Sequence, residues 1–234
     1  MAKSALDKYL FKPFFGSSHT WALGELRKIP KDAFILDIGA GSCGIGEALK
    51  KEGYANLWAV EVDKEALKRA QEVYDYAFEK IEDIEKSDFD AILLLDVIEH
   101  LQDPSGCLAK ALSMLKIGGV MLVVVPNIAH WSVRFPLLFG FFNYSERSIL
   151  DSTHLHFFTR ARFKKMLLSQ KSAQLIKIES TIEPFELVFP RWLWNNPIYA
   201  LLSRLRLFGA NLLPGLFAYQ HAAVIKKIGT GSVP

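Results

Sequence analysis

Between residues 33 and 126 the chain alternates short, continuous apolar runs with segments of helical periodicity. Four apolar runs end where polar or turn residues begin: Ala33–Ile38, Leu57–Val60, Ala91–Leu95 and Val120–Val125. Strands that are apolar along their whole length are typical of a parallel sheet covered by crossover helices on both faces. The alternation therefore predicts an α/β fold with a mostly parallel sheet. A further strand must fit within residues 75–88, but this segment is too polar for its position to be predicted.

After residue 126 the alternation stops. Residues 127–158 are predicted to form an inserted loop or short helices. Two final strands are expected over residues 173–182 and 216–227, and the aromatic stretch 185–215 lies between them.

Charge divides the 234-residue chain at the same place. Residues 1–126 carry 15 Lys+Arg and 20 Asp+Glu, whereas residues 127–234 carry 13 and 5. The second part also holds most of the aromatic residues. These counts indicate an acidic binding core joined to a basic, apolar second half.

Several classes of protein are excluded by composition. Cys43 and Cys107 are the two cysteines, without the spacing of a metal site or a disulfide framework, which indicates a reducing compartment. The N-terminus lacks the uninterrupted apolar run of a secretory signal, and charged residues and a proline interrupt the apolar stretch 185–217, so no membrane span is predicted. We expect a cytoplasmic protein, with contact at the membrane surface as an alternative.

A glycine-rich turn begins at Gly39, directly after the first predicted strand, and leads into a helix. Glycine accepts positive φ and lets a ligand lie against the main chain, while free N–H groups at a helix start favour a ligand's negative end. Gly39, Gly41 and Gly44 satisfy G-x-G-x-x-G, and Glu61 ends the second strand, where an acid can chelate a ribose diol. The ligand is therefore a dinucleotide or S-adenosylmethionine. A triphosphate loop is excluded, because Ile45 stands at the position of its lysine.

Four segments together resemble the successive motifs of class I S-adenosylmethionine-dependent methyltransferases. They are LDIGAG at 36–41, AVEVD at 59–63, FDAI at 89–92 and DVIEHL at 96–101. The acid two residues before the first glycine and the D-V-x-E-H-L segment do not belong to the dinucleotide fingerprint.

Downstream segments extend the resemblance to residues 31–228. Pro126-Asn127, Leu150-Asp151, Thr153–Thr159 and Pro214–Gln220 resemble small-molecule methyltransferases related to methionine-biosynthesis methyltransferase-like proteins and to cell-envelope gene clusters. The resemblance implies a Rossmann-like, mostly parallel seven-stranded sheet with an antiparallel last strand and helices on both faces.

The same resemblance implies a division of the chain. Residues 1–30 would form a helical cap or lid, and residues 31–126 the cofactor half of the methyltransferase domain. Residues 127–158 and 185–215 would be inserts on the substrate side, and residues 229–234 a flexible tail.

The resemblance also implies where S-adenosylmethionine, and its product S-adenosyl-L-homocysteine (SAH), would bind. The implied contact residues are Asp37, Gly39, Ala40, Gly41, Glu61, Val62, Glu79, Ile81 and Asp96. The glycines would pass under the methionine part, Asp37 would order the turn, and Glu61 would bind both ribose hydroxyls with Val62 against the adenine. The acid at the adenine edge departs from the family pattern, because either Lys80 stands in its place or Glu79 takes over by a one-residue slip.

Methyl transfer from a sulfonium requires the nucleophile, methyl carbon and sulfur to lie in line, and a protonated acceptor also needs a base. Histidine suits a hydroxyl acceptor, since its pKa is close to working pH. His100, His154 and His156 are the predicted catalytic residues, with His154 and His156 on one face of an alternating segment. His130 is expected to be a lid residue.

A metal site is an alternative use of these residues. Asp96, Glu99 and His100 would share a face in a helical turn. With His154 they resemble the metal site of small-RNA 2′-O-methyltransferases, and similar segments occur in ubiquinone-biosynthesis O-methyltransferases. A divalent metal is nevertheless not predicted, because most such helix starts are simply hydrogen-bonded.

The basic apolar half leaves three interpretations open. Residues 131–144 and 185–217 are predicted to form a substrate lid and pocket wall, a dimer interface, or a contact with a membrane or lipid-linked substrate. Nucleic acid is disfavoured, since the cationic residues are interleaved with aliphatic ones. The protein would be a monomer or a homodimer.

The sequence thus predicts a methyltransferase acting on a small molecule, at a hydroxyl of a partly apolar or lipid-linked acceptor. Two alternatives stay open: an NAD(P)-binding oxidoreductase, and a catalytically silent cofactor-binding scaffold.

Overall fold

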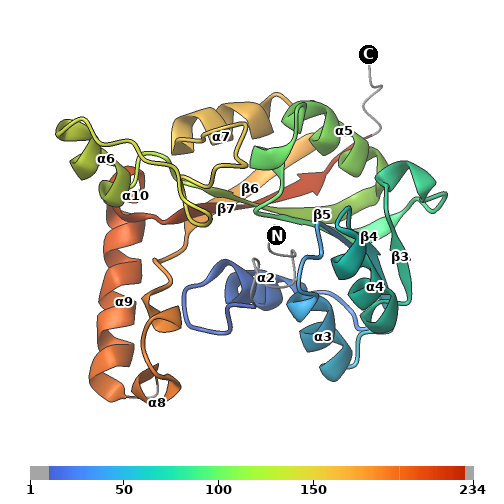
Figure 1. Ribbon diagram of the computed structural model, residues 1–234. Coiled ribbons are helices and arrows are strands. Elements are labelled where there is room, and N and C mark those ends of the chain that lie inside the picture. Colours follow the sequence, from blue (N-terminus) through green and yellow to red (C-terminus); the bar gives the residue numbers. More distant parts are fainter. Residues whose placement is uncertain (1–10, 195, 230–234) are drawn as a thin grey trace.

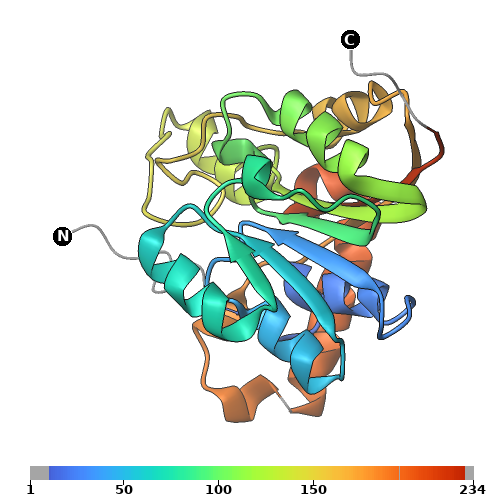
Figure 2. The same ribbon diagram turned by 90° about the vertical axis from the view of Figure 1, so that its right-hand side faces the viewer.

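The computed structural model describes residues 11–194 and 196–229, which form a sheet between two layers of helices (Figures 1 and 2). Its strand order is β3-β2-β1-β4-β5-β7-β6. The strands are β1 Phe34–Ile38, β2 Asn56–Val60, β3 Tyr76–Phe78, β4 Phe89–Leu95, β5 Leu115–Pro126, β6 Ala173–Ser180 and β7 Gln220–Lys227. β7 runs antiparallel to both of its neighbours, and the first five strands pair in parallel. The predicted fold class is confirmed.

Helices cover both faces of the sheet. The α-helices are α2 Ser18–Leu26, α3 Gly44–Lys51, α4 Lys64–Val73, α5 Pro104–Met114, α6 Trp131–Leu138, α7 Arg160–Leu168, α8 Arg191–Trp194, α9 Pro197–Leu212 and α10 Pro214–Phe217. Three short 3-10 turns are η1 Ile81–Asp83, η2 Ile98–His100 and η3 Phe185–Leu187. One apolar core contains side chains of α2, α3 and α4, and the other contains side chains of α5 and α7. Alternate residues of the central strands enter the two cores, which explains why their sequences are apolar throughout.

Local signals place the helix starts as the sequence suggests. The side chain of Asp63 accepts hydrogen bonds from the N–H groups of Glu65 and Ala66, and so caps α4. Thr159 caps α7 in the same way, through the N–H of Arg162. These caps end the loops at fixed positions beside the strand ends.

The cap or lid expected over residues 1–30 stays a prediction, and its described portion contains α2. In its described portion, α2 buries Ala22, Leu23 and Leu26 in the core beneath β1 and β4. An apolar face of this kind makes α2 part of a helix layer. Residues 1–10 lie outside the described residues, as does the predicted tail 229–234 apart from residue 229.

After β5 the chain enters the first of two segments that are predicted to be inserts on the substrate side. Residues 127–158 contain α6 and a long loop, and residues 185–215 contain α8 and α9 with their connections. Both lie at the end of the molecule away from α3 and α4 (Figure 1).

Within the described residues, no helix combines the length and the apolar character that crossing a membrane requires.

Two helical glycines provide a test of the packing. A Cβ at Gly46 in α3 would lie 2.4 Å from the Tyr74 ring, whereas a Cβ at Gly24 in α2 would meet nothing within 4 Å. Gly46→Ala should therefore cost about 1–3 kcal/mol of unfolding free energy through overpacking. Gly24→Ala should gain roughly 0.5–1 kcal/mol, because alanine loses less backbone entropy in a helix. Urea unfolding measures both, and a Gly46→Ala variant as stable as Gly24→Ala would contradict the described packing.

Candidate functional site

The carboxyl ends of β2, β1 and β4 lie side by side in the sheet. The chain continues from β1 to β2 on one side, while β4 lies on the other side of β1 and leads on to β5. A ligand of an open α/β sheet binds at such a reversal of strand order, outside the carboxyl ends. The glycine turn, Glu61 and Asp96 all lie at these three strand ends.

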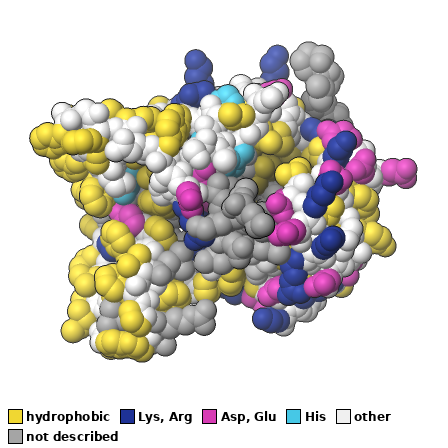
Figure 3. Space-filling view, in the orientation of Figure 1, with side chains coloured by type: hydrophobic (Ala, Val, Ile, Leu, Met, Phe, Trp, Pro, Cys, Tyr) yellow, Lys and Arg dark blue, Asp and Glu magenta, His cyan; other side chains and the backbone are white. Residues whose placement is uncertain are grey.

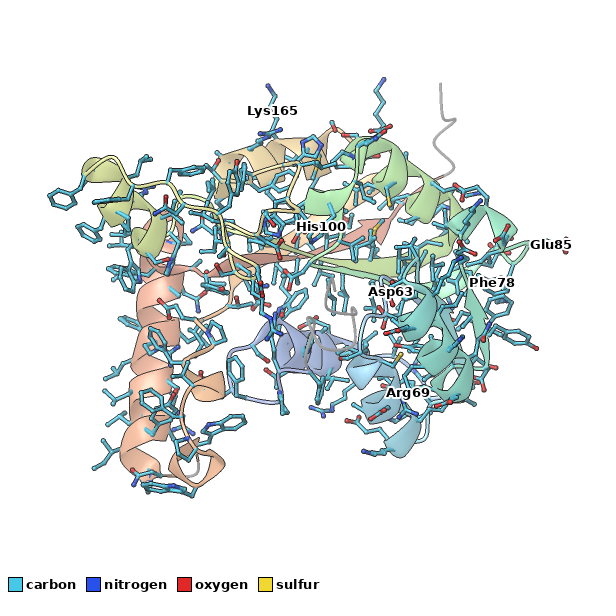
Figure 4. The ribbon with its side chains drawn as sticks, in the orientation of Figure 1. Asp63, Arg69, Phe78, Glu85, His100 and Lys165 are labelled. Atoms are coloured by element: carbon cyan, nitrogen blue, oxygen red, sulfur yellow. The ribbon has the colours of Figure 1, made fainter. Side chains whose placement is uncertain are left out.

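The glycine turn has the backbone geometry that its sequence predicts. Gly39 and Gly41 have φ of +78° and +51°, in a region that glycine enters without steric cost. The carboxylate of Glu61 accepts a 2.7 Å hydrogen bond from the N–H of Gly41 and a 2.9 Å bond from that of Asp63. Glu61 thus joins the turn after β1 to the start of α4, where Asp63 is labelled in Figure 4.

Asp37 is buried beneath this turn. The Tyr74 hydroxyl donates a 2.6 Å hydrogen bond to Asp37 Oδ2 and accepts one of 3.1 Å from the N–H of Gly46. Burial raises the pKa of Asp37 to about 6, against the opposing effect of the Tyr74 hydrogen bond and with a contribution from the Glu61 charge. Asp37 is thus linked through Tyr74 to the start of α3, its role in ordering the turn stays a prediction, and Tyr74 is the partner that sequence reasoning missed.

Asp96 follows β4 with φ of +57°. Gln220 Nε2 donates to both of its carboxylate oxygens, at 2.6 and 2.7 Å, and Lys12 Nζ lies 3.3 Å from Oδ2. The side-chain oxygen of Gln220 in turn accepts a hydrogen bond from Thr181 Oγ1. Asp96 is thus fixed by residues from both ends of the chain.

Of these two partners of Asp96, Gln220 could be inferred from the sequence and Lys12 could not. Gln220 closes the Pro214–Gln220 segment that carries part of the resemblance, so its importance could be inferred. Lys12 has no signal in the sequence, because its proximity to Asp96 depends on the path of the chain before α2.

The residues implied for the adenine lie at the edge of this site. Val62 is 74% exposed and Glu79 is also exposed. Ile81 is half-buried in η1 and packs against the core. An exposed Val62 beside Glu61 is available to a flat ring, and the choice between Glu79 and Lys80 stays a prediction.

Two of the predicted catalytic histidines lie together. The rings of His100 and His154 are 4.7 Å apart, centroid to centroid. His154 Nδ1 is 3.0 Å from the carbonyl oxygen of Ile149. A carbonyl can only accept, so Nδ1 carries the proton and Nε2 carries the lone pair of the neutral ring. Burial, together with the charge of His100, lowers the pKa of His154 and favours this neutral form.

A buried carboxylate lies beside the two histidines. Neither oxygen of Glu99 has a hydrogen-bond partner among the described residues. Burial and the nearby charge of Asp96 raise the pKa of Glu99 well above its usual range. Ligand atoms of Glu99, His100 and His154 lie within 4.8 Å of one another, so the group could hold a metal ion. Carboxylate oxygen and imidazole nitrogen suit several divalent cations.

His156 lies apart from this pair, which corrects the expectation that His154 and His156 share one face. The segment forms no strand, because the N–H groups of Leu155 and His156 both donate to the carbonyl of Glu99. His156 Nε2 instead lies 3.4 Å from the Gln102 carbonyl, and the ring lines a groove between α5 and α7. Lys165, in the same groove, projects from α7 (Figure 4).

Asp96 is likewise outside the cluster of Glu99, His100 and His154. A helical turn over residues 96–100 would have brought it onto their face, but only residues 98–100 form a 3-10 turn. The positive φ of Asp96 directs its carboxylate to Gln220 and Lys12 instead.

Comparison with known proteins gives one family. A family model described as a methyltransferase domain matches residues 21–170. A ubiquinone biosynthesis O-methyltransferase from Xylella fastidiosa is 30% identical over 112 residues, which are 43% of this chain and 45% of that protein. One from Xanthomonas axonopodis pv. citri is 28% identical over 108 residues, with 42% and 45% covered. The chain thus spans less than half the length of these curated relatives.

Solved structures share the fold. A putative sarcosine dimethylglycine methyltransferase from Galdieria sulphuraria matches with a TM-score of 0.60 and 17% identity, over 90% of this chain and 84% of that one. The magnesium protoporphyrin IX methyltransferase of Synechocystis with bound SAH matches with a TM-score of 0.58 and 11% identity, over 89% and 80%. At these identities the likeness concerns the architecture.

The raised pKa of Asp37 predicts a pH dependence of stability. The folded chain holds this proton more tightly than the unfolded chain, so the contribution is fully present below pH 3.8 and is lost as the pH rises through about 6. Asp37→Asn removes the titration. The unfolding free energy of the wild type minus that of Asp37→Asn should fall by roughly 2–3 kcal/mol between pH 4 and pH 7. Urea unfolding across this range measures the difference, and a difference that is constant or rises with pH would refute the assignment.

Proposed function

Since the chain belongs to the methyltransferase domain family, as a class I S-adenosylmethionine-dependent methyltransferase, we propose that it methylates a hydroxyl oxygen of a small, partly apolar acceptor. The observation that carries the proposal is the neutral His154, with its Nε2 lone pair, beside His100 and the buried Glu99. The O-methyltransferase relatives support oxygen as the accepting atom.

The cofactor would occupy the strand ends described above. Gly39 and Gly41 hold the turn in its positive-φ conformation, and the Glu61 carboxylate is already oriented by two backbone N–H groups. Asp96, held by Gln220, lies at the end nearer the histidines. S-adenosylmethionine supplies a methyl group on a positively charged sulfur.

His154 supplies the base. The acceptor oxygen forms its bond to the methyl carbon as the carbon–sulfur bond breaks, and the hydroxyl proton passes to Nε2 of His154. The Ile149 carbonyl holds Nδ1–H and fixes the ring tautomer during this transfer. Asp96 is a positioning residue in this scheme.

A specific observation also favours a second role for the same cluster. A carboxylate without a hydrogen-bond partner is costly to bury, and a divalent cation between Glu99, His100 and His154 would remove that cost. Such a cation would polarise the acceptor hydroxyl and lower its pKa.

Binding of the cofactor is tested at Glu61. Glu61→Gln keeps an oxygen that can accept from the Gly41 N–H but removes the charge and one acceptor. The loss of a charge-assisted hydrogen bond should weaken SAH binding at least about tenfold. Calorimetry measures the affinity. Glu65→Gln, at an exposed position of α4, is the matched control and should bind as the wild type does. Equal affinity in both variants would remove Glu61 from the cofactor site.

Catalysis is tested with two histidine variants from one loop. His154→Ala should lower the rate of SAH formation about a hundredfold or more, because the base is lost. The affinity for SAH should stay unchanged. His156→Ala should retain most of the activity. The assay uses phenols with and without a long alkyl chain as acceptors.

Three results would count against the proposal. An inactive wild type that binds SAH would favour a silent scaffold, and equal activity of His154→Ala and wild type would exclude the base. Binding of NAD without SAH would overturn the cofactor assignment. Chelator treatment separates the two roles of the cluster. If His154 acts as a base alone, the methylation rate stays unchanged in chelator. If the cluster holds a cation, the methylation rate falls in chelator and returns when Mg²⁺ or Mn²⁺ is added.

A further inference from the structure

Helix α9 exposes its large apolar side chains and buries its small and polar ones. The exposed residues are Ile198, Leu201, Leu202, Leu205, Phe208 and Leu212. Their spacing of three or four residues places them on one side of the helix. The side chains that α9 buries are Ser203 and Ala210. A helix that belongs to a protein core has the opposite arrangement, so this apolar side is built for contact with something else.

A buried polar network holds α9 in this orientation. Glu186 Oε1 accepts hydrogen bonds from Ser203 Oγ at 3.1 Å and from Arg206 at 3.2 Å. Arg206 also lies 3.3 Å from Glu183 Oε2. Rotation of α9 to bury its leucines would break these contacts, so that the buried Glu186 would lose Ser203 and Arg206 and Glu183 would lose Arg206. The outward leucines are therefore a fixed feature of the fold.

The same network fixes the N-terminus of α6. Glu183 Oε1 lies 3.0 Å from both His130 Nε2 and Trp131 Nε1. Burial raises the pKa of Glu183, but hydrogen bonds from His130 and Trp131 outweigh this effect and bring it to about 2. The buried His130 also caps α6 through the N–H of Ser132. α6 and α9 are thus held by one charged carboxylate.

The apolar surface of α9 continues across α10 onto α6. A groove between α6 and α10 is lined by Arg134, Phe135, Leu137, Leu138 and Leu216. We call the following exposed residues, together with those of α9, the α6–α9 surface: Phe135, Leu137, Leu138, Phe139, Leu213 and Phe217. Figure 3 shows hydrophobic side chains gathered along the edge formed by α6 and α9. Exposed apolar patches of this extent mark binding surfaces.

The exposed charged side chains of α6 and α9 have one sign. Arg134 and Arg204 are exposed. The two carboxylates between residues 183 and 217 are Glu183 and Glu186, and both pair with Arg206 inside the fold. A two-fold dimer through this surface would bring the same arginines together without carboxylates to pair them. Anionic lipid headgroups would supply the missing negative charge and an apolar phase for the leucines.

We propose that the α6–α9 surface binds the interface of a membrane that contains anionic lipid. The apolar side of α9 and the tip of α6 enter the boundary between headgroups and acyl chains, and Arg134 and Arg204 contact lipid phosphates. The aromatic residue Trp192 of α8, which is 72% exposed, suits the same depth. This inference concerns binding alone and stands whether or not the proposed acceptor is correct.

The test is co-sedimentation with vesicles of phosphatidylcholine, with and without phosphatidylglycerol. The wild type should sediment with the phosphatidylglycerol vesicles and less so at high salt. The double variant Leu201→Glu/Leu205→Glu should lose at least about tenfold in affinity. Leu168→Glu, at an exposed leucine of α7, is the matched control and should bind as the wild type does. Arg204→Gln should lose about fivefold, and Lys164→Gln, at an exposed position of α7, should not.

Folding and oligomeric state are measured on the same samples. An unchanged melting temperature shows that the variants fold, since each changed side chain is exposed. The proposal is overturned if the wild type does not bind the anionic vesicles, or if the double variant binds as well as Leu168→Glu. It is also overturned if light scattering shows a dimer that the double variant dissociates, because a second copy then covers the surface.

Discussion

The hydrogen bond from the Tyr74 hydroxyl to Asp37 is the interaction on which the cofactor end of the molecule depends. It joins β1 to the end of α4, and the same hydroxyl accepts from Gly46 at the start of α3. The glycine turn lies between these anchored points. The N–H groups of Gly39, Ala40 and Gly41 already donate to the Val60 carbonyl and the Glu61 carboxylate, so the turn is held to the end of β2. A smaller side chain than Tyr74 would leave the Gly46 N–H unsatisfied, and a Cβ at Gly46 would displace the ring.

The parts of the fold that the sequence predicts are those with one strong local signal. The central strands are apolar throughout because both of their faces are buried, and the caps Asp63 and Thr159 mark helix starts. β3 has no such signal. It is an edge strand of three residues, and Tyr76 is 54% exposed, so the apolar run is too short to indicate a strand by itself. The confirmed glycine geometry likewise follows from residue type, whereas the position of Lys12 depends on tertiary structure.

The residues Glu99, His100 and His154 could be singled out from the sequence, but their arrangement could not. His100 and His154 meet because the carbonyl of Glu99 holds the N–H groups of Leu155 and His156, and so fixes the loop against η2. The segment therefore does not form the strand in which alternate side chains would share a face, and His156 lies apart from His154. One backbone dihedral removes Asp96 from the group in a similar way. Spacing arguments presuppose a regular backbone, and functional loops often lack one.

The basic, apolar second half has a physical explanation in the same terms. Periodicity shows that α9 is amphipathic, but it does not show which side faces the protein. The direction is decided by Glu183 and Glu186, which must keep Arg206 and Ser203 inside to remain paired. Because the network pairs the carboxylates of this segment within the fold, the exposed side chains of α9 are the charged Arg204 and the apolar leucines. The charge asymmetry of the sequence is thereby converted into a surface that is both cationic and apolar. An anionic lipid interface complements both properties at once.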